Sequence, residues 1–285
     1  MEAPVDPWCL ANNNMWRSDT DTLQVWTRTM IEIESVALQG RISRPGAWSF
    51  PDCLELGVPG QNTLTWEESK STLALFALTS APLLLGNDAR PGRMQERLVD
   101  LLTNRDMLAV NQGYSTAASF AGGRVWSGPP HLEIWAKPLP GHQVGVGLFN
   151  RGGTVIGTIP NGSTFYPPLP PHCNDPNSTL DACTGCFVDD DKPWLAPCDD
   201  NATASTGAQP MRLEFSQLPR TWFIDNPRAD VGKEPGPLTC DVYDVFATTK
   251  RGAVLGRFRN GWSTAPTSPV PPHGIRFLRV GNCSA

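Results

Sequence analysis

The pattern of secondary structure changes between residues 113 and 130, and this change constrains the fold more than any other feature. Before it, apolar residues recur at helical spacing over 22–38, 65–79 and 95–102, and a short apolar run lies at 82–86. After it, strand-like segments follow one another, with turn residues between them, at 132–139, 143–152, 211–218, 243–252 and 274–280. Helices that alternate with short buried strands are typical of a parallel α/β sheet, and consecutive strands are typical of an antiparallel domain. The predicted fold class is therefore α/β plus all-β.

The same change predicts two domains. Residues 1–120 form the α/β part and residues 121–285 the all-β part. A segment at about 160–210, rich in Pro, Asn, Asp, Ser and Thr, carries four of the eight cysteines. We interpret this segment as an insertion in the β domain that is stapled by disulfides and glycosylated.

Cysteines and glycosylation sequons point to the secretory route. Four acceptor patterns of the type Asn-X-Ser/Thr begin at Asn161, Asn177, Asn201 and Asn282. Such sequons beside eight cysteines are typical of secreted or lysosomal and vacuolar proteins. The pair Cys183 and Cys186 also has the spacing of a zinc site, but the sequons favour disulfides there. The first residues, MEAPVDPW, have neither the basic nor the apolar region of a signal peptide, so we expect such a segment upstream of Met1.

Charge and hydropathy exclude two classes of partner. The formal net charge is −5 and the sequence has no cluster of Lys and Arg, which argues against nucleic-acid binding. The longest apolar stretch, Leu73 to Leu85, is interrupted by Pro82 and is too short for a membrane span. The 10 Trp residues suit either core packing or stacking on sugar rings.

Several segments, in order along the chain, resemble glycoside hydrolase family 27, the α-galactosidase and α-N-acetylgalactosaminidase family. The three that carry most of the resemblance are Asn14–Asp21 (NMWRSDTD), Arg44–Gly57 (RPGAWSFPDCLELG) and Leu73–Arg90 (LALFALTSAPLLLGNDAR). Residues 104–112, 131–139 and 271–280 are similar to later segments of the family. The resemblance implies a (β/α)8 TIM barrel followed by an antiparallel β-sandwich. It also implies that this chain holds only barrel strands six to eight, near 12–17, 47–53 and 82–86, with strands one to five before Met1.

The resemblance assigns roles to four residues. Asp21 falls on the position of the general acid/base of a retaining glycosidase, which protonates the leaving oxygen and later activates water. Arg17 matches a sugar-binding arginine, and Asp52 matches an aspartate that supports the site at the carboxyl end of a barrel strand. Trp16 lies beside them, either as packing or as a substrate contact. Asp19 falls on a position that the family leaves variable and is interpreted as a surface residue.

Other positions depart from the family pattern. The Asn and Asp of its W-N-D-P-D segment are replaced by Ser49 and Phe50, and the Met after Asp52 is Cys53. The nucleophile belongs to a K-x-D segment, and no such segment occurs in this chain. Asp88 is expected to tie down a turn. The resemblance implies no cofactor and no metal, and the four histidines are scattered, with a structural role expected for His273.

The leading hypothesis is an α-galactosidase-like retaining hydrolase of terminal α-D-galactosyl residues that lacks its nucleophile half and is therefore inactive alone. Galactose, N-acetylgalactosamine and arabinopyranose stay open as the sugar. The alternative is a non-catalytic secreted module that binds glycans or a protein. A third possibility is a broken gene or a truncated gene model with no product of this length, because without the other five strands the helices at 22–38 and 65–79 would have no sheet to pack on.

Overall fold

The computed structural model describes residues 7–18, 21, 26–37, 39–57, 64–128, 131–152, 207–224 and 236–284. Four of the predicted sites fall outside these ranges: Asp19 and the sequons at Asn161, Asn177 and Asn201. The cysteines of the expected insertion, from Cys173 to Cys198, also lie outside them. In the described part of the chain, no helix is long and apolar enough to cross a membrane.

The first part of the chain carries the helices and a short parallel sheet. Its helices are α1 (Pro7–Asn12), α2 (Trp26–Ala37), α3 (Trp66–Leu78), α4 (Glu96–Leu102) and α5 (Arg105–Gln112). Strands β1 (Met15–Arg17) and β2 (Trp48–Phe50) pair in parallel, with Trp16 opposite Ser49. A single parallel bridge joins Leu54 to Leu85. Two of the three expected barrel strands are therefore regular strands, and the third is reduced to this bridge.

The N-terminus of α3 follows the sequence closely. Thr65 is its N-cap, and its hydroxyl accepts a hydrogen bond from the backbone N–H of Glu68. The carboxylate of Glu68 accepts one from the backbone N–H of Thr65 in return. This capping box satisfies two backbone donors that a helix start leaves unpaired, so the start of the helix is encoded locally.

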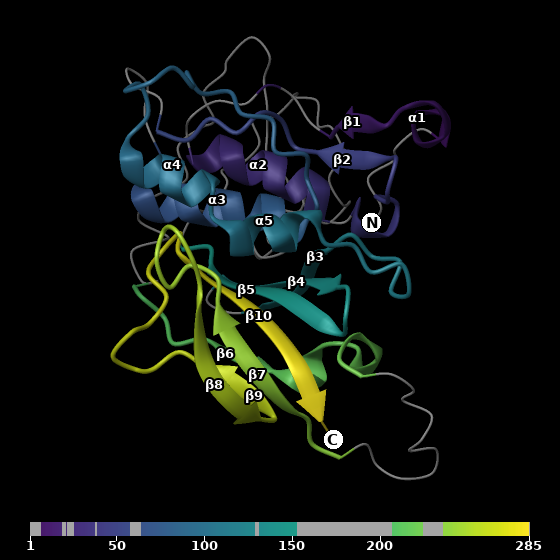
Figure 1. The fold of residues 1–285 in the computed structure, drawn as a ribbon, viewed down its shortest axis with the longest axis vertical. Helices are drawn as coiled ribbons and strands as arrows, with labels where there is room; N and C mark the ends of the chain where they lie inside the picture. Colours follow the sequence, from purple (N-terminus) through teal and green to yellow (C-terminus); the bar gives the residue numbers. More distant parts are fainter. Residues whose placement is uncertain are drawn as a thin grey trace, which may run out of the picture.

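The second part of the chain forms a six-stranded antiparallel sheet in the order β3-β4-β5-β10-β7-β8 (Figure 1). Its strands are β3 (Gly123–Gly128), β4 (Leu132–Leu139), β5 (Gln143–Asn150), β7 (Thr239–Asp244), β8 (Ala253–Arg259) and β10 (Ile275–Ser284). The short strands β6 (Arg212–Glu214) and β9 (Gly261–Ser263) make a separate antiparallel pair. A disulfide joins Cys240 in β7 to Cys283 in β10.

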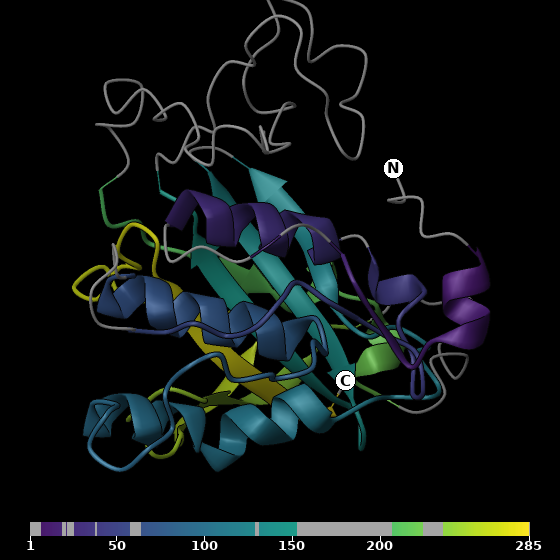
Figure 2. The same ribbon diagram turned by 90° about the horizontal axis from the view of Figure 1, so that it is seen from above.

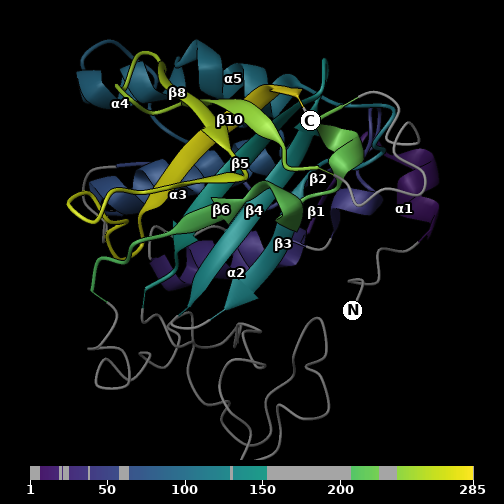
Figure 3. The same ribbon diagram turned by 90° about the horizontal axis from the view of Figure 1, so that it is seen from below.

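Both faces of the large sheet are covered. Helices α2, α3 and α5 lie side by side across one face (Figure 2), and α3 contacts β4, β5 and β10. On the other face (Figure 3), β6 and β9 pack with buried side chains such as Ile134, Val146 and Leu278. Burial on both sides explains why β4 and β5 are buried along almost their whole length.

Two glycines of β5 let α3 approach the sheet closely. A Cβ on Gly147 would lie 2.7 Å from side-chain atoms of both Leu78 and Ile275. A Cβ on Gly145 would lie 2.8 Å from Val110 of α5. The alternation of Val and Gly in this strand therefore places small residues under the helices and large ones on the opposite face.

This packing corrects one expectation. The helices at 22–38 and 65–79 were expected to have no sheet to pack on without further barrel strands, and that expectation is wrong. They lie on the antiparallel sheet, and one apolar core joins Trp26 and Leu78 to Trp135, Phe149 and Phe277. Helices and sheet exclude water from each other, so this interface buries the apolar face of each.

Several observed strands differ from the predicted ones. The segment 211–218 is a strand only over β6 and continues as a 3₁₀ turn at Phe215–Gln217. The segment 243–252 is mostly a turn, because β7 ends at Asp244 and the chain reverses before β8. Strands β3, β8 and β9 were missed, since Gly123–Gly128 and Ala253–Arg259 mix glycine and arginine with few regularly spaced apolar residues.

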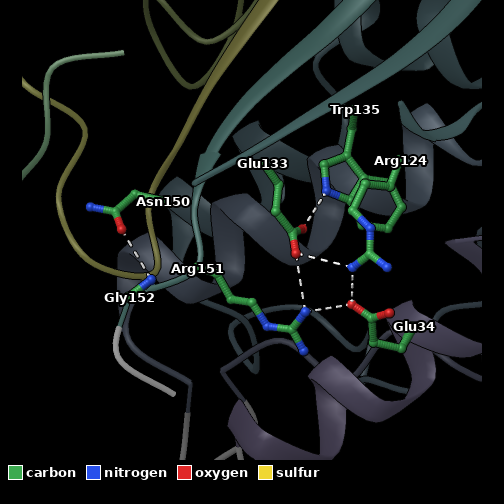
Figure 4. A network of polar contacts seen from close by, with 7 residues as sticks. All are labelled: Glu34, Arg124, Glu133, Trp135, Asn150, Arg151 and Gly152. Atoms are coloured by element: carbon green, nitrogen blue, oxygen red, sulfur yellow. Dashed lines mark hydrogen bonds and ion pairs between the residues drawn. The ribbon is translucent and has the colours of Figure 1, made fainter. Parts of the chain in front are cut away.

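A network of four charged side chains ties α2 to the sheet (Figure 4). Arg151 Nη1 lies 2.5 Å from Glu34 Oε1 of α2 and 3.1 Å from Glu133 Oε1 of β4. Arg124 Nη1 of β3 lies 2.5 Å and 3.0 Å from the same two oxygens. Burial alone would raise the pKa of Glu133, but the guanidinium groups of Arg151 and Arg124 lower it below its usual value. Glu133 is therefore held as a carboxylate inside the protein.

A buried lysine joins two further helices to β4. Lys137 is fully buried, and its ammonium group donates hydrogen bonds to the carbonyl oxygens of Val110 and Asn111, both at 2.6 Å. The carbonyl oxygen of Ala77 lies 3.4 Å away. Burial lowers the pKa of Lys137 to about 7. These carbonyls belong to the last turns of α5 and α3, where helices leave acceptors unpaired and carry negative partial charge.

We expect Arg151→Met to reduce the free energy of unfolding by about 3–5 kcal/mol, because the buried carboxylate of Glu133 and the half-buried one of Glu34 would then share one guanidinium group. Urea denaturation of both proteins measures the difference. The matched control is Arg90→Met, which breaks an exposed pair with Asp88 and should change the free energy of unfolding far less, because solvent screens the pair. Equal losses in the two variants would show that the buried network does not stabilise the fold.

Candidate active site

Three of the residues predicted from sequence meet beyond the carboxyl ends of the parallel strands. Arg17 ends β1, and its Nη1 atom lies 2.8 Å from Asp21 Oδ1 and 3.3 Å from Asp52 Oδ2. Asp52 follows β2 by two residues and is buried, whereas the side chain of Asp21 is 83% exposed. One guanidinium therefore connects a buried carboxylate to an accessible one. Such an arrangement leaves the outer carboxylate accessible to a molecule bound from solvent.

Arg17 is flanked by residues that are fixed to α2 and to the 3₁₀ turn that follows it. Trp16 is 8% exposed, and its indole N–H donates a hydrogen bond to Gln39 Oε1 at 2.9 Å. Gln39 Nε2 in turn donates to the carbonyl oxygen of Ser35 at 2.8 Å. On the other side of Arg17, the hydroxyl of Ser18 lies 2.5 Å from that of Ser35. The backbone on both sides of Arg17 is thus held in place by α2.

These contacts clarify Trp16 and add two residues that sequence reasoning missed. Trp16 is buried, and its role as packing or as a substrate contact stays a prediction. Gln39 and Ser35 were not singled out, because a glutamine and a serine near the end of a helix carry no recognisable signal. Only their hydrogen bonds to Trp16 and Ser18 relate them to the candidate site.

The substituted positions in the second segment are buried. Phe50 belongs to the apolar core with Leu54 and Phe76, so its ring adds to packing. The Ser49 hydroxyl is buried and has no hydrogen-bond partner among the described residues. Cys53 is half-buried beside Asp52, whose Oδ1 accepts a hydrogen bond from the Cys53 backbone N–H at 2.8 Å. Burial, followed by the nearby carboxylates of Asp52 and Glu55, raises the pKa of the Cys53 thiol.

Two other candidates have structural roles in this geometry. Asp88 accepts hydrogen bonds from the backbone N–H and the guanidinium group of Arg90, so it closes a turn on the surface. His273 stacks on Trp26 with ring centroids 4.8 Å apart, and its Nδ1 lies 2.7 Å from Glu68 Oε1. Neither contact brings these residues to Arg17. No cluster of metal-binding side chains occurs among the residues that the structure describes.

Part of the chain is similar to known proteins. The family model described as "Alpha galactosidase A" matches residues 8–113, which include Arg17, Asp21 and Asp52. An α-galactosidase of Arabidopsis thaliana, "Alpha-galactosidase 2", is 35% identical over 145 residues, which are 51% of this chain and 34% of that protein. Human "Alpha-galactosidase A" is 31% identical over 142 residues, which are 48% of this chain and 31% of that protein. The chain is a relative of the family 27 glycoside hydrolases.

Solved structures share the fold of nearly the whole chain. A family 27 β-L-arabinopyranosidase from Geobacillus stearothermophilus, in complex with arabinose, has a TM-score of 0.62 at 16% identity. The similarity covers 99% of this chain and 48% of that one. The α-galactosidase of Saccharomyces cerevisiae with raffinose has a TM-score of 0.55 at 16% identity, covering 94% of this chain and 57% of that one.

The chain spans about a third of the length of the curated relatives that it matches. These relatives include α-galactosidases and an "Alpha-N-acetylgalactosaminidase" of Gallus gallus that is 28% identical. The sugar therefore stays open among family members. The roles of Asp21, Arg17, Asp52 and Trp16 stay predictions.

The position of Cys53 beside Asp52 can be tested without any substrate. We expect Asp52→Asn to make Cys53 react severalfold faster with iodoacetamide at pH 8. Removing a carboxylate that raises the thiol pKa increases the thiolate fraction, and the thiolate is the nucleophile. Peptide mapping of alkylated Cys53 over time gives the rate. Asp88→Asn serves as the control and should leave the alkylation rate of Cys53 unchanged. An unchanged rate in Asp52→Asn would show that the Asp52 carboxylate does not influence the Cys53 thiol.

Proposed function

We propose that this chain supplies the acid/base half of an α-galactosidase-like retaining glycoside hydrolase site, with Asp21 as the general acid/base. The observation that carries the proposal is the contact of Arg17 with both Asp21 and Asp52, at the ends of two parallel strands. The match of the family model to the same residues supports it. Arg17 and Asp52 would then hold the sugar and orient Asp21.

The chemistry needs a second carboxylate. In a retaining glycosidase, one carboxylate attacks the anomeric carbon while the other protonates the leaving oxygen and then deprotonates water. Asp21 suits the second role, because its side chain is exposed and its position is set by a guanidinium group. The nucleophile, with the K-x-D segment, would come from a part of the enzyme outside this sequence. This chain alone would then bind sugar weakly and hydrolyse nothing.

We propose that further strands pair with the edges of the short parallel sheet. In the described part of the chain, β1 pairs with β2 alone, and the strand segment at Leu85 makes its bridge to Leu54. Met15 on β1 is 44% exposed, and Leu84 and Leu85 are 38% and 41% exposed. Apolar side chains on unpaired strands are suited to pairing with further strands. We propose that they correspond to barrel strands six to eight and that strands one to five pair with these edges.

The proposal predicts activity by complementation. This chain should not hydrolyse an α-galactoside, but joined to the N-terminal part of a plant α-galactosidase, or mixed with it, it should. In the complemented enzyme, Asp21→Asn should lower kcat for an unactivated α-galactoside by about 10²–10⁴-fold, the usual contribution of general acid catalysis. A dinitrophenyl α-galactoside, whose leaving group needs little protonation, should show a much smaller loss at the galactosylation step.

Asp88→Asn is the matched control, because Asp88 also follows a strand segment but contacts only Arg90 and Arg93 among the described residues. It should leave both rates unchanged. Full activity of Asp21→Asn on the unactivated substrate would refute the role of Asp21.

One observation favours the non-catalytic alternative. A cavity of about 300 Å³ lies between the loop after α5, the β4–β5 turn and the segment at Trp222. Its lining combines the rings of Tyr114, His142 and Trp222 with hydroxyl groups of Ser115 and Thr116. Aromatic rings beside hydroxyls suit a saccharide. Glycan binding that is abolished by Trp222→Ala and unaffected by Arg17→Ala, without hydrolysis in any complemented form, would favour this alternative over the enzyme.

We also propose a secretory location, with N-glycans at the sequons beginning at Asn161, Asn177 and Asn201. The disulfide between Cys240 and Cys283 supports an oxidising compartment. The fourth sequon, at Asn282, has a different environment.

A further inference from the structure

The sequon Asn282-Cys283-Ser284 forms the last three residues of β10 and has a cysteine in its middle. Cys283 is bonded to Cys240 of the neighbouring strand β7. The pairing of β10 with β7 is irregular between Gly281 and Ser284, and Asn282 takes a positive φ of 50° there. Asparagine tolerates this left-handed conformation better than most residues. The acceptor site and the disulfide therefore share one residue, Cys283.

Both side chains that define the sequon are already engaged. The amide nitrogen of Asn282, where a glycan would be attached, donates a hydrogen bond to Asp241 Oδ2 at 3.0 Å. The hydroxyl of Ser284 accepts a hydrogen bond from Arg257 Nη2 at 2.9 Å. Asp241 is the same residue that pairs with Arg257, at 2.9 Å. We call this group of Asp241, Arg257, Asn282 and Ser284 the clasp.

The clasp also holds the backbone. Arg257 Nη1 donates to the carbonyl oxygen of Asn282 at 2.9 Å, and Arg257 Nη2 lies 3.3 Å from the carbonyl oxygen of Thr239. The hydrogen bond from Asn282 and then the Arg257 guanidinium lower the pKa of Asp241, so this carboxylate stays ionised as an acceptor. Asn282 and Ser284 are exposed to solvent, but exposure alone does not present them as an acceptor pair.

Glycan transfer has requirements that this arrangement does not meet. The Asn nitrogen attacks the anomeric carbon of a lipid-linked oligosaccharide diphosphate. The N–C bond forms, the C–O bond to the diphosphate breaks, the diphosphate leaves with the electron pair, and the amide loses one proton. A transferase recognises the Asn and the Ser hydroxyl together, in a chain segment that it can bind. In the folded strand, neighbours occupy both groups and the disulfide prevents the segment from leaving the sheet.

We propose that Asn282 is a conditional glycosylation site that closure of the Cys240–Cys283 disulfide switches off. A chain whose Cys283 is still reduced presents a mobile Asn-Cys-Ser acceptor. Once the disulfide forms and β10 pairs with β7, the transferase can no longer bind the Asn-Cys-Ser segment. The relative rates of disulfide formation and glycan transfer then determine whether a molecule carries a glycan next to the C-terminal end of β10. This inference does not depend on any catalytic role of the chain.

Mass spectrometry of Asn282 occupancy tests the proposal. The full chain is directed into the secretory pathway of a eukaryotic host by an added leader, with a tag that carries one unstructured Asn-Ser-Thr acceptor. Only molecules glycosylated in the tag are analysed, so each has met the transferase. We expect occupancy at Asn282 to be severalfold higher in Cys283→Ser and in Cys240→Ser than in the wild type. Cys283→Ser keeps an Asn-X-Ser acceptor while removing the disulfide.

Further variants distinguish the effect of the disulfide on Asn282 occupancy from that of the clasp. Arg257→Met keeps both cysteines, so its occupancy should stay near that of the wild type, and Ser284→Ala should abolish modification. If a cysteine variant is not secreted, brief treatment of cells with dithiothreitol delays the wild-type disulfide and should raise occupancy in the same way. Equal occupancy in wild type and Cys283→Ser would overturn the proposal. So would an unmodified Asn282 in both cysteine variants, or a rise in Arg257→Met as large as that in Cys283→Ser.

Discussion

The contact between three helices and the antiparallel sheet is the constraint on which the rest of this structure depends. A purely apolar interface would allow the helices to shift along the sheet, but here charged side chains fix the position of the helices. Lys137 reaches from β4 to the last carbonyl groups of α3 and α5, and Glu133 in the same strand reaches through Arg151 and Arg124 to Glu34 of α2. Removing one partner of a buried ion pair is costly, so these contacts disfavour other arrangements of the helices on the sheet.

That arrangement also positions the candidate site. Helix α2 is held on the sheet by Glu34, and its C-terminal region holds Trp16 and Ser18 through Gln39 and Ser35. These contacts fix the backbone on both sides of Arg17, which then lies between Asp21 and Asp52. A route of direct contacts thus runs from the antiparallel sheet to the carboxylates. The part of the chain with the family match shares one apolar core with the strands that follow it.

Local signals in the sequence predicted much of this, and their limits have physical causes. The start of α3 is encoded locally by the capping box of Thr65 and Glu68, because both partners lie within one turn. The motifs around Arg17 and Asp52 indicated that these residues belong to one site, but only the parallel register of β1 and β2 brings them within contact distance. Strand β8 was missed because its exposed edge carries Val254 and Leu255 without the alternation that marks a half-buried strand.

The sequence by itself determined the change from alternating helices and short strands to consecutive strands, the relationship to family 27 and the identity of the candidate carboxylates. Periodicity, caps and motifs are properties of residues that are close in sequence, so they can be recognised without knowledge of the fold. The tertiary structure alone decided what covers the helices, which charges pair across the interface and which atoms occupy the sequon at Asn282. Those contacts join residues separated by tens to hundreds of positions, so no local pattern encodes them. Their partners are chosen only when the apolar faces of helices and sheet are buried against each other.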